Sequence, residues 1–259
     1  MVFMVKSKYS QPSQIIELAI PSTFTAESKN IFVRTFRIGQ LVRWALIHKV
    51  HRVYVYHDKD PLFDSRGLGR YIVKVMRYAL VPPALKKRAF ALKQTNRAFG
   101  VIPAKNIAQP HWVVALRTNK DQALVTDGAK KWWVRMKESH GTAFMANSTE
   151  QLLPEESPQY EGFYVHFHSD LGTLAQTKRG RGYRIIGASA RGRALRSAPK
   201  FDRALIVFGS AFRDIFEIEK DIYDDVWAIP EDYPTRTLRT DEAVVKLLTG
   251  LRWLNRWSV

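Results

Sequence analysis

The sequence predicts an α/β fold, in which a parallel sheet flanked by helices is interrupted by a small antiparallel β-barrel. Short apolar strands alternate with amphipathic helices over the first ninety residues, a pattern typical of a parallel sheet. From His111 to Asn147 only closely spaced β-type runs occur, with turn residues between them and no room for helices. The strand and helix alternation returns at Gly162. We therefore expect one α/β domain made of residues 1–90 and 156–259, with a barrel insert at residues 91–155.

Four elements make up the first alternation. The apolar run Ile15–Ile20 ends at a proline, which predicts a buried strand. Ile38–Val50 carries apolar residues at helical spacing, so a helix is expected there. Arg52–Tyr56 is β-branched and aromatic and predicts a second strand. A second helix is expected over Leu68–Leu80, stopped by the proline pair at residues 82–83.

The remaining elements follow from the same patterns. The insert strands are expected at Trp112–Leu116, Ala123–Val125 and Trp132–Met136. Later strands of the α/β domain are expected at Gly162–Phe167, Tyr183–Ile186, Ala204–Phe208 and Val226–Ile229. The final helix opens with Thr240 as N-cap and acidic residues in its first turn, where the helix dipole favours them. Its apolar face is wide, so it packs on the sheet or against another subunit.

The charge of the chain points to a polyanionic partner. Lys and Arg number 41 against 24 Asp and Glu, which gives a net charge of +17. Residues 1–100 carry 18 basic and 5 acidic side chains, whereas residues 201–259 carry 8 and 11. An excess confined to the first three quarters of the chain is typical of a nucleic-acid binder. RNA is favoured over DNA, because no zinc finger, basic zipper or clear helix-turn-helix is present.

Composition excludes several other classes. The chain has no cysteine, so disulfides, thiolate metal sites and a cysteine nucleophile are absent. No apolar run of about 18 residues exists, so we expect no membrane partner. The N-terminus lacks the apolar core of a signal peptide, and a cytoplasmic location is expected. His166 and His168 share one strand face without an evident third ligand, so no metal site is expected.

Basic residues interleaved with aromatic ones mark the candidate RNA contacts. In Lys130–Arg135 cations flank two tryptophans on an expected strand, a composition that suits base stacking and phosphate contact. Strand alternation places Trp132 and Trp133 on opposite faces, so one is expected to stack on bases and the other to join the barrel core. The full set of candidate RNA-binding residues is Arg37, Lys86, Lys87, Arg88, Lys130, Lys131, Trp132, Trp133, Arg135, Lys178, Arg179, Arg181, Arg191 and Arg193.

Four groups of segments together resemble RNA methyltransferases of the SPOUT class, the α/β-knot fold with an OB-like insertion. Their order and spacing cover nearly the whole chain. The segments are Ile20–Ser22 with Arg37–Ala45 and Val53–Asp58, Leu80–Pro103, Tyr160–Val165 with Gly187–Gly192, and Ala204–Ser210 with Ile229–Pro230 and Thr235–Ala243.

The resemblance implies a C-terminal trefoil knot, a homodimer through the knot and the terminal helix, and S-adenosylmethionine bound by three knot loops. Those loops correspond to Gly187–Gly192, Phe208–Ile215 and Ile229–Thr237, and family members hold the cofactor largely through backbone groups. It also implies a functional arginine at Arg43, four residues after a glycine. Arg43 would hold a phosphate or stabilise charge developing on the target base, or it is an ordinary helix-surface arginine. The implied cofactor residues are Gly187, Phe208, Gly209, Ser210, Ile229, Pro230 and Thr237.

The three loops depart from the family pattern. Asp214 replaces a usual glycine, residues 231–234 replace a Gly-Gln pair, and Ala188 and Ala190 replace the usual polar residues. Each change adds bulk, adds negative charge or removes a polar group in a backbone-lined pocket, so the cofactor site is expected to be degenerate. The main hypothesis is an RNA-binding protein on ribosomal RNA of the large ribosomal subunit. The alternative is an active S-adenosylmethionine-dependent rRNA base methyltransferase with Arg43 near the reacting centre.

Overall fold

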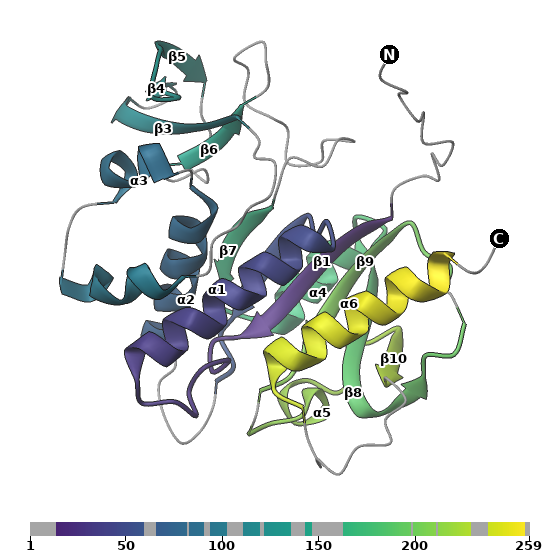
Figure 1. The fold of residues 1–259 in the computed structure, drawn as a ribbon. Helices are drawn as coiled ribbons and strands as arrows, with labels where there is room; N and C mark the ends of the chain where they lie inside the picture. Colours follow the sequence, from purple (N-terminus) through teal and green to yellow (C-terminus); the bar gives the residue numbers. More distant parts are fainter. Residues whose placement is uncertain are drawn as a thin grey trace, which may run out of the picture.

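A six-stranded sheet forms the centre of the computed structural model, with strand order β10-β8-β9-β1-β2-β7 and every pair parallel (Figure 1). The structure describes residues 14–59, 66–81, 83–90, 94–102, 111–119, 122–135, 143–146, 163–197, 199–210, 212–228 and 238–256. The expected α/β class and parallel sheet are confirmed. The strands are β1 (Ile15–Pro21), β2 (Arg52–Tyr56), β7 (Tyr164–His168), β8 (Arg184–Ala194), β9 (Arg203–Phe208) and β10 (Asp225–Ala228).

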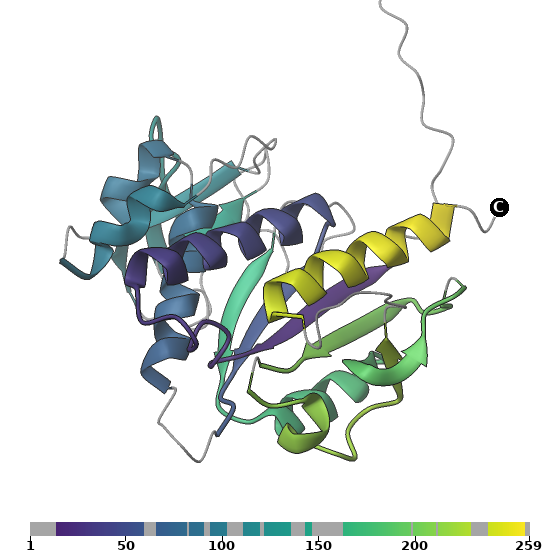
Figure 2. The same cartoon turned by 60° about the horizontal axis from the view of Figure 1, so that its bottom comes forward.

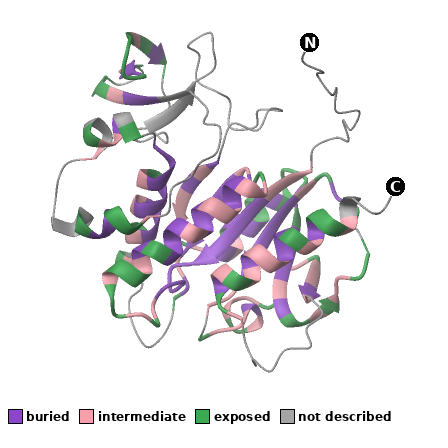
Figure 3. Ribbon diagram, viewed as in Figure 1, coloured by how far each residue is buried: buried purple, intermediate pink, exposed green. Residues whose placement is uncertain are grey.

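Helices cover both faces of this sheet, because successive side chains of each strand point to opposite faces. Leu18 and Ile20 of β1 belong to the core beneath α1 (Ile31–Ile47), α2 (Arg66–Leu80) and α6 (Thr240–Arg256). Ala19 belongs to a second core beneath α4 (Leu171–Arg179) and α5 (Ile215–Ile218). Figure 2 shows α1 and α6 on one side of the sheet and α4 and α5 on the other, and Figure 3 shows the central strands buried between them.

The helix boundaries differ from the expected ones at several places. Helix α1 begins at Ile31, seven residues before the expected start, because the Asn30 side chain accepts hydrogen bonds from the first-turn amides. The proline pair ends α2 as expected, but Pro83 opens a further short helix, α3 (Pro83–Ala89). Thr240 is already within α6 rather than its N-cap; its hydroxyl instead donates to the Gly209 carbonyl at 2.8 Å.

The expected insert strands form a second, antiparallel sheet with strand order β5-β4-β3-β6. The 3₁₀ helix Gln94–Val101 and α3 precede it in the chain. One face holds a small core of Val113, Ala123, Val125 and Val134. Closure of this sheet into an OB-like barrel stays a prediction. The strands are β3 (His111–Thr118), β4 (Gln122–Thr126), β5 (Lys131–Arg135) and β6 (Ala143–Ala146).

The described residues contain neither a helix that could span a membrane nor a cluster of metal-ligating side chains. None of their helices has the length and apolar character needed to cross a membrane. None of their His, Asp and Glu side chains gather in a group of three or more that could hold a metal ion.

Candidate functional site

The carboxyl edge of the parallel sheet is where the fold places a ligand. Strands β1 and β9 are neighbours, but the chain leaves β1 toward β2 on one side and leaves β9 toward β10 on the other. In parallel α/β sheets, ligands bind outside the carboxyl ends of the strands at such a point of reversal. Three of the expected cofactor residues, Phe208, Gly209 and Ser210, lie at the end of β9 and so at this point.

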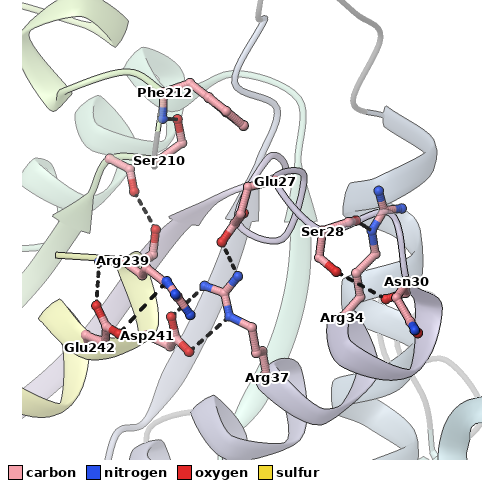
Figure 4. Close-up of polar contacts among 12 residues, drawn as sticks. Glu27, Ser28, Asn30, Arg34, Arg37, Ser210, Phe212, Arg239, Asp241 and Glu242 are labelled. Atoms are coloured by element: carbon pink, nitrogen blue, oxygen red, sulfur yellow. Dashed lines mark hydrogen bonds and ion pairs between the residues drawn. The ribbon is translucent and has the colours of Figure 1, made fainter. Parts of the chain in front are cut away.

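Hydrogen bonds within the loop after β9 occupy the backbone amides of residues 210, 212 and 213. The Ser210 hydroxyl oxygen accepts hydrogen bonds from the amides of Phe212 at 3.1 Å and Arg213 at 3.0 Å, and the contact of Ser210 with Phe212 is drawn in Figure 4. The Ser210 amide itself donates to the Arg213 carbonyl at 3.0 Å. A Cβ on Gly209 would lie 2.6 Å from that same carbonyl oxygen, so the tight turn requires glycine. The loop amides therefore point to acceptors within the loop.

Asp214 has a structural role in the same loop. One carboxylate oxygen caps α5 by accepting from the Phe216 amide at 3.1 Å. The other accepts from the Ser189 hydroxyl of β8 at 2.7 Å. The Asp214 carboxylate thus joins the loop after β9 to β8.

The segment Gly187–Gly192 is not the expected loop, because it lies within β8. Gly187 pairs with Val207 of β9 and with Val226 of β10, after which the ladder to β10 is irregular and resumes at Arg193. A Cβ on Gly187 would lie 2.3 Å from Cδ1 of the buried Ile215. The space beside this glycine is therefore filled by a side chain of α5.

Asp58, at the end of β2, joins three loops at the carboxyl edge. Its buried carboxylate accepts from the Thr23 hydroxyl of the loop after β1 and from Arg213 Nη1 of the loop after β9, the latter at 2.7 Å. Its amide donates to the Ser22 hydroxyl at 3.1 Å. Arg213 also donates from Nη2 to the Glu217 carbonyl at 2.6 Å. The sequence analysis did not identify this network, whose members come from distant segments.

A second network ties α6 to the loop after β1 (Figure 4). The Arg37 guanidinium of α1 donates to Asp241 at 2.6 and 3.2 Å and forms an ion pair with Glu27. Burial lowers the pKa of Arg37, but the two carboxylates outweigh this effect and raise it above the usual value. The Arg37 side chain is 8% exposed. The prediction that Arg37 contacts RNA is therefore wrong, because its guanidinium is held by two carboxylates.

Arg43 lies on α1 six residues after Arg37, or about 9 Å further along the helix axis. Its side chain is half-buried. The functional role of Arg43 stays a prediction. Ile229, Pro230 and Thr237 lie outside the described residues, as does the side chain of Arg88.

Lys178 of α4 is also unavailable to RNA. Its side chain is 2% exposed and forms an ion pair with Glu17 of β1, whose other carboxylate oxygen accepts from Arg52 at 3.2 Å and from the Tyr183 hydroxyl at 3.0 Å. Burial lowers the pKa of Lys178, and Glu17 only partly offsets this. The predicted RNA contact of Lys178 is wrong, because the side chain lies in the core beneath the sheet.

The other basic candidates lie at the surface with different partners. Lys86 of α3 is half-buried, with Nζ 4.4 Å from the centre of the Tyr78 ring, and burial lowers its pKa. Arg179 and Arg193 are exposed but pair with Asp224 at 2.9 Å and Asp225 at 2.7 Å. The remaining described candidates that are exposed are Lys87, Lys130, Lys131, Trp133, Arg135, Arg181 and Arg191.

The two tryptophans of β5 lie on opposite faces, as alternation predicts. Trp133 is 50% exposed. Trp132 is partly buried and packs on the small core of the second sheet.

Part of the chain is similar in sequence to known proteins. Residues 15–132 match a family model described as "Putative RNA methyltransferase". An uncharacterized protein of Halobacterium salinarum is 31% identical over 84 residues, and one of Haloarcula marismortui is 30% identical over 88 residues. In both cases the match covers 32% of this chain and 29% of the relative, so the chain aligns with less than a third of the relatives' own length.

Solved structures with a similar arrangement were also found. The A. aeolicus TrmH/SpoU tRNA modifying enzyme is 10% identical, with 95% of this chain and 77% of that chain covered and a TM-score of 0.45. A structure from Porphyromonas gingivalis, described as a "putative RNA methyltransferase of the TrmH family", is 12% identical, with 95% and 62% covered and a TM-score of 0.43.

Proposed function

We propose that the protein is an RNA-binding protein on a SPOUT methyltransferase fold with a degenerate cofactor site, a proposal supported by the match of residues 15–132 to a family model described as "Putative RNA methyltransferase". The proposed partner is ribosomal RNA of the large ribosomal subunit, in the cytoplasm. The proposal includes a discontinuous SPOUT domain, residues 1–90 and 156–259, with a C-terminal trefoil knot. It also includes an OB-like insert at residues 91–155.

The observation that carries the proposal is the internal pairing at the carboxyl edge of the sheet. A cofactor held by backbone groups needs free amides and open space beside glycines. Here the amides of residues 210, 212 and 213 have partners within their own loop. Ile215 fills the space beside Gly187, and Asp214 is bonded to Ser189 and to the start of α5. These contacts support the proposal that the loop after β9 and the adjoining part of β8 no longer hold S-adenosylmethionine.

Calorimetric titration with S-adenosylmethionine tests the cofactor half of this proposal. We expect no binding heat and no thermal stabilisation at millimolar ligand. A ligand present at 100 times its Kd would stabilise the folded state by about 2.7 kcal/mol, which a thermal shift detects readily. Binding at micromolar affinity would contradict a degenerate site.

The surplus of basic side chains supports the RNA half. Most of the 41 Lys and Arg lie in the first two hundred residues. Several of the exposed ones lie on β5 of the second sheet and on β8. Ribosomal RNA offers a large, stable polyanion, so strong retention without turnover suits this charge. Co-sedimentation with isolated large subunits at high salt would support the proposal; sedimentation free of the subunits at moderate salt would contradict it.

An active rRNA base methyltransferase is the second candidate. It is favoured by the family match and by Arg43 on α1, at the position implied by the resemblance. Deletion of the gene would then remove one methyl group from rRNA, and the wild-type chain but not Arg43→Ala would restore it. Arg34→Ala, on the same helix, is the matched control, because Arg34 donates to the Ser28 carbonyl and is not an implied functional residue.

The resemblance also leads us to propose a homodimer through the knot and α6. Trp253, near the end of α6, is 64% exposed and could be covered by a second copy. Light scattering of the purified chain should give twice the monomer mass; a monomer at micromolar concentration would contradict the dimer.

A further inference from the structure

The outward face of β5 carries cations on both sides of an aromatic ring. Lys131, Trp133 and Arg135 are exposed, whereas Trp132 is partly buried and Val134 is buried. Because alternate residues of a strand share a face and each residue advances about 3.3 Å, the cations lie about 7 Å before and after the indole along the strand. The Trp133 indole therefore lies between two cations, Lys131 and Arg135, on the same face of the strand.

The neighbouring strands extend this face. Trp133 pairs with Leu124 of β4, and Leu124 pairs with Arg117 of β3. Arg117 is exposed, and the adjacent Leu116 is 39% exposed at an irregular step of the ladder. Directly opposite residues lie close enough for their side chains to touch. The ring of Trp133 is thus bordered by an apolar side chain, with a third cation one strand further on.

The charge of this face is of one sign. Among the described residues of β3, β4, β5 and their connections, Asp127 is the only acidic one. Its carboxylate accepts from the amides of Ala129 and Lys130, each at 2.8 Å, so it serves the turn between β4 and β5. Within the described part of the chain, Lys131 and Arg135 form no ion pair. The face is complementary to a polyanion.

We infer that this face binds single-stranded RNA, with one unpaired base stacked on Trp133 and the flanking phosphates against Lys131 and Arg135. The inference rests on the proposed RNA-binding function and names the structural class of RNA that the second sheet takes. A half-exposed indole can stack only on a base whose face is open, which an RNA duplex does not present along its length. The two cations along the strand follow the backbone of such a nucleotide on both sides of the base. Trp132, whose ring packs on the small core, has no place in the contact.

The test is a fluorescence anisotropy titration with two labelled RNAs of equal length, a single-stranded oligouridine and a blunt duplex. Trp133→Ala should weaken binding of the single strand roughly 5- to 150-fold, the range for loss of one base–aromatic stack. Trp133→Tyr should retain most of the affinity, because a phenol ring also stacks. Phe32→Ala, at an exposed aromatic side chain on α1, is the control and should bind as the wild type does. The salt dependence should be the same for Trp133→Ala and wild type, since no charge is removed.

Each outcome has a distinct meaning. Selective loss of single-strand affinity in Trp133→Ala, with rescue by Trp133→Tyr, supports the inference. If Trp133→Ala binds the single strand as tightly as wild type, or if wild type binds only the duplex, the inference is overturned while RNA binding itself stands. If wild type binds neither RNA, both the inference and the proposed function fail. Circular dichroism of the variants confirms that the substitutions leave the fold intact.

Discussion

The carboxyl edge of the six-stranded sheet and the outward face of the four-stranded sheet use their polar groups in opposite ways. At the edge, the loop amides, the Asp58 carboxylate and the Asp214 carboxylate all have partners within the chain. On the outward face, Lys131 and Arg135 flank an indole that is 50% exposed. The first region is closed by internal contacts, and the second presents charge and an aromatic surface to solvent.

Under the proposed function, this difference explains how the fold stays stable without a bound cofactor. Polar groups that no longer meet a ligand are costly when buried unless they find other partners. Ser210, Asp214 and Arg213 supply those partners from the loop itself. The edge then contributes to stability, and the proposed RNA binding takes place on a different surface, whose groups remain hydrated. Substitutions in the two regions should accordingly affect different measurements.

The largest expected effect is on stability, from Asp58→Ala. The Asp58 side chain is fully buried, and its loss leaves Arg213 and Thr23 without their shared acceptor. Removing one partner of a buried ion pair costs about 3–5 kcal/mol, and we expect the lower end because the Arg213 side chain is 20% exposed. Urea denaturation measures the free energy of unfolding. Arg191→Ala is the control: its pair with Glu217 spans 4.0 Å at the surface and should change that free energy by less than about 0.5 kcal/mol. Equal effects of the two substitutions would contradict a closed edge.

A smaller loss of stability is expected from Asp214→Ala. The substitution removes the cap of α5 and the acceptor of the Ser189 hydroxyl, which together should lower the free energy of unfolding by about 1–2 kcal/mol. It should not create S-adenosylmethionine binding, because the Ser210 hydroxyl still occupies the loop amides. Urea denaturation and calorimetry measure the two effects. Micromolar cofactor binding by the variant would show that the carboxylate alone blocks the site.

The salt dependence of RNA binding should distinguish the basic side chains of β5 from those of β8. The double variant Lys131→Ala/Arg135→Ala loses two phosphate contacts, so the slope of log K against log salt should fall by about 1.4 for a single strand. Arg193→Ala should change the slope less, since that guanidinium is already paired with Asp225 at 2.7 Å. Anisotropy titrations at several salt concentrations give both slopes. A larger change for Arg193→Ala would place the phosphate contacts at β8 instead of β5.

The sequence predicted most of the strands, because their signals are local. Ile15–Pro21 and Arg52–Tyr56 are short apolar runs with β-branched or aromatic residues, and both form strands at the expected residues. The early start of α1 was missed because Arg34, Thr35 and Arg37 interrupt its apolar pattern. Arg37 is nevertheless buried, since its carboxylate partner Asp241 lies 204 residues away in the chain. Contacts over such separations cannot be predicted from local periodicity.

The candidate site could be predicted only in part, again because local patterns do not show contacts between distant segments. Alternation placed Trp132 and Trp133 on opposite faces, but which of them is covered depends on how the second sheet packs. The resemblance implied a loop at Gly187–Gly192, yet this segment lies in β8 because β9 and β10 pair with parts of that strand. Lys178 looked like part of a basic loop, yet it is held in the core by Glu17. The spacing of basic residues alone does not tell a surface charge from a buried ion pair.

The smallest expected effect is on acid stability at the carboxyl ends of β2 and β7, where Asp170 caps α4. The Lys59 ammonium and then the Thr173 amide donate to the Asp170 carboxylate and hold its pKa well below the usual range. The folded protein therefore binds this proton less readily than the unfolded chain. The stabilisation is complete above the ordinary aspartate pKa of about 3.9 and is lost as the pH falls below it. Asp170→Asn should lower stability slightly at pH 7, and the difference from wild type should shrink as the pH falls from about 4 toward 2, so the stability of the variant should vary less with pH. Acid titration followed by circular dichroism measures the difference, and parallel curves for the two proteins would show that the Lys59 pair contributes nothing in solution.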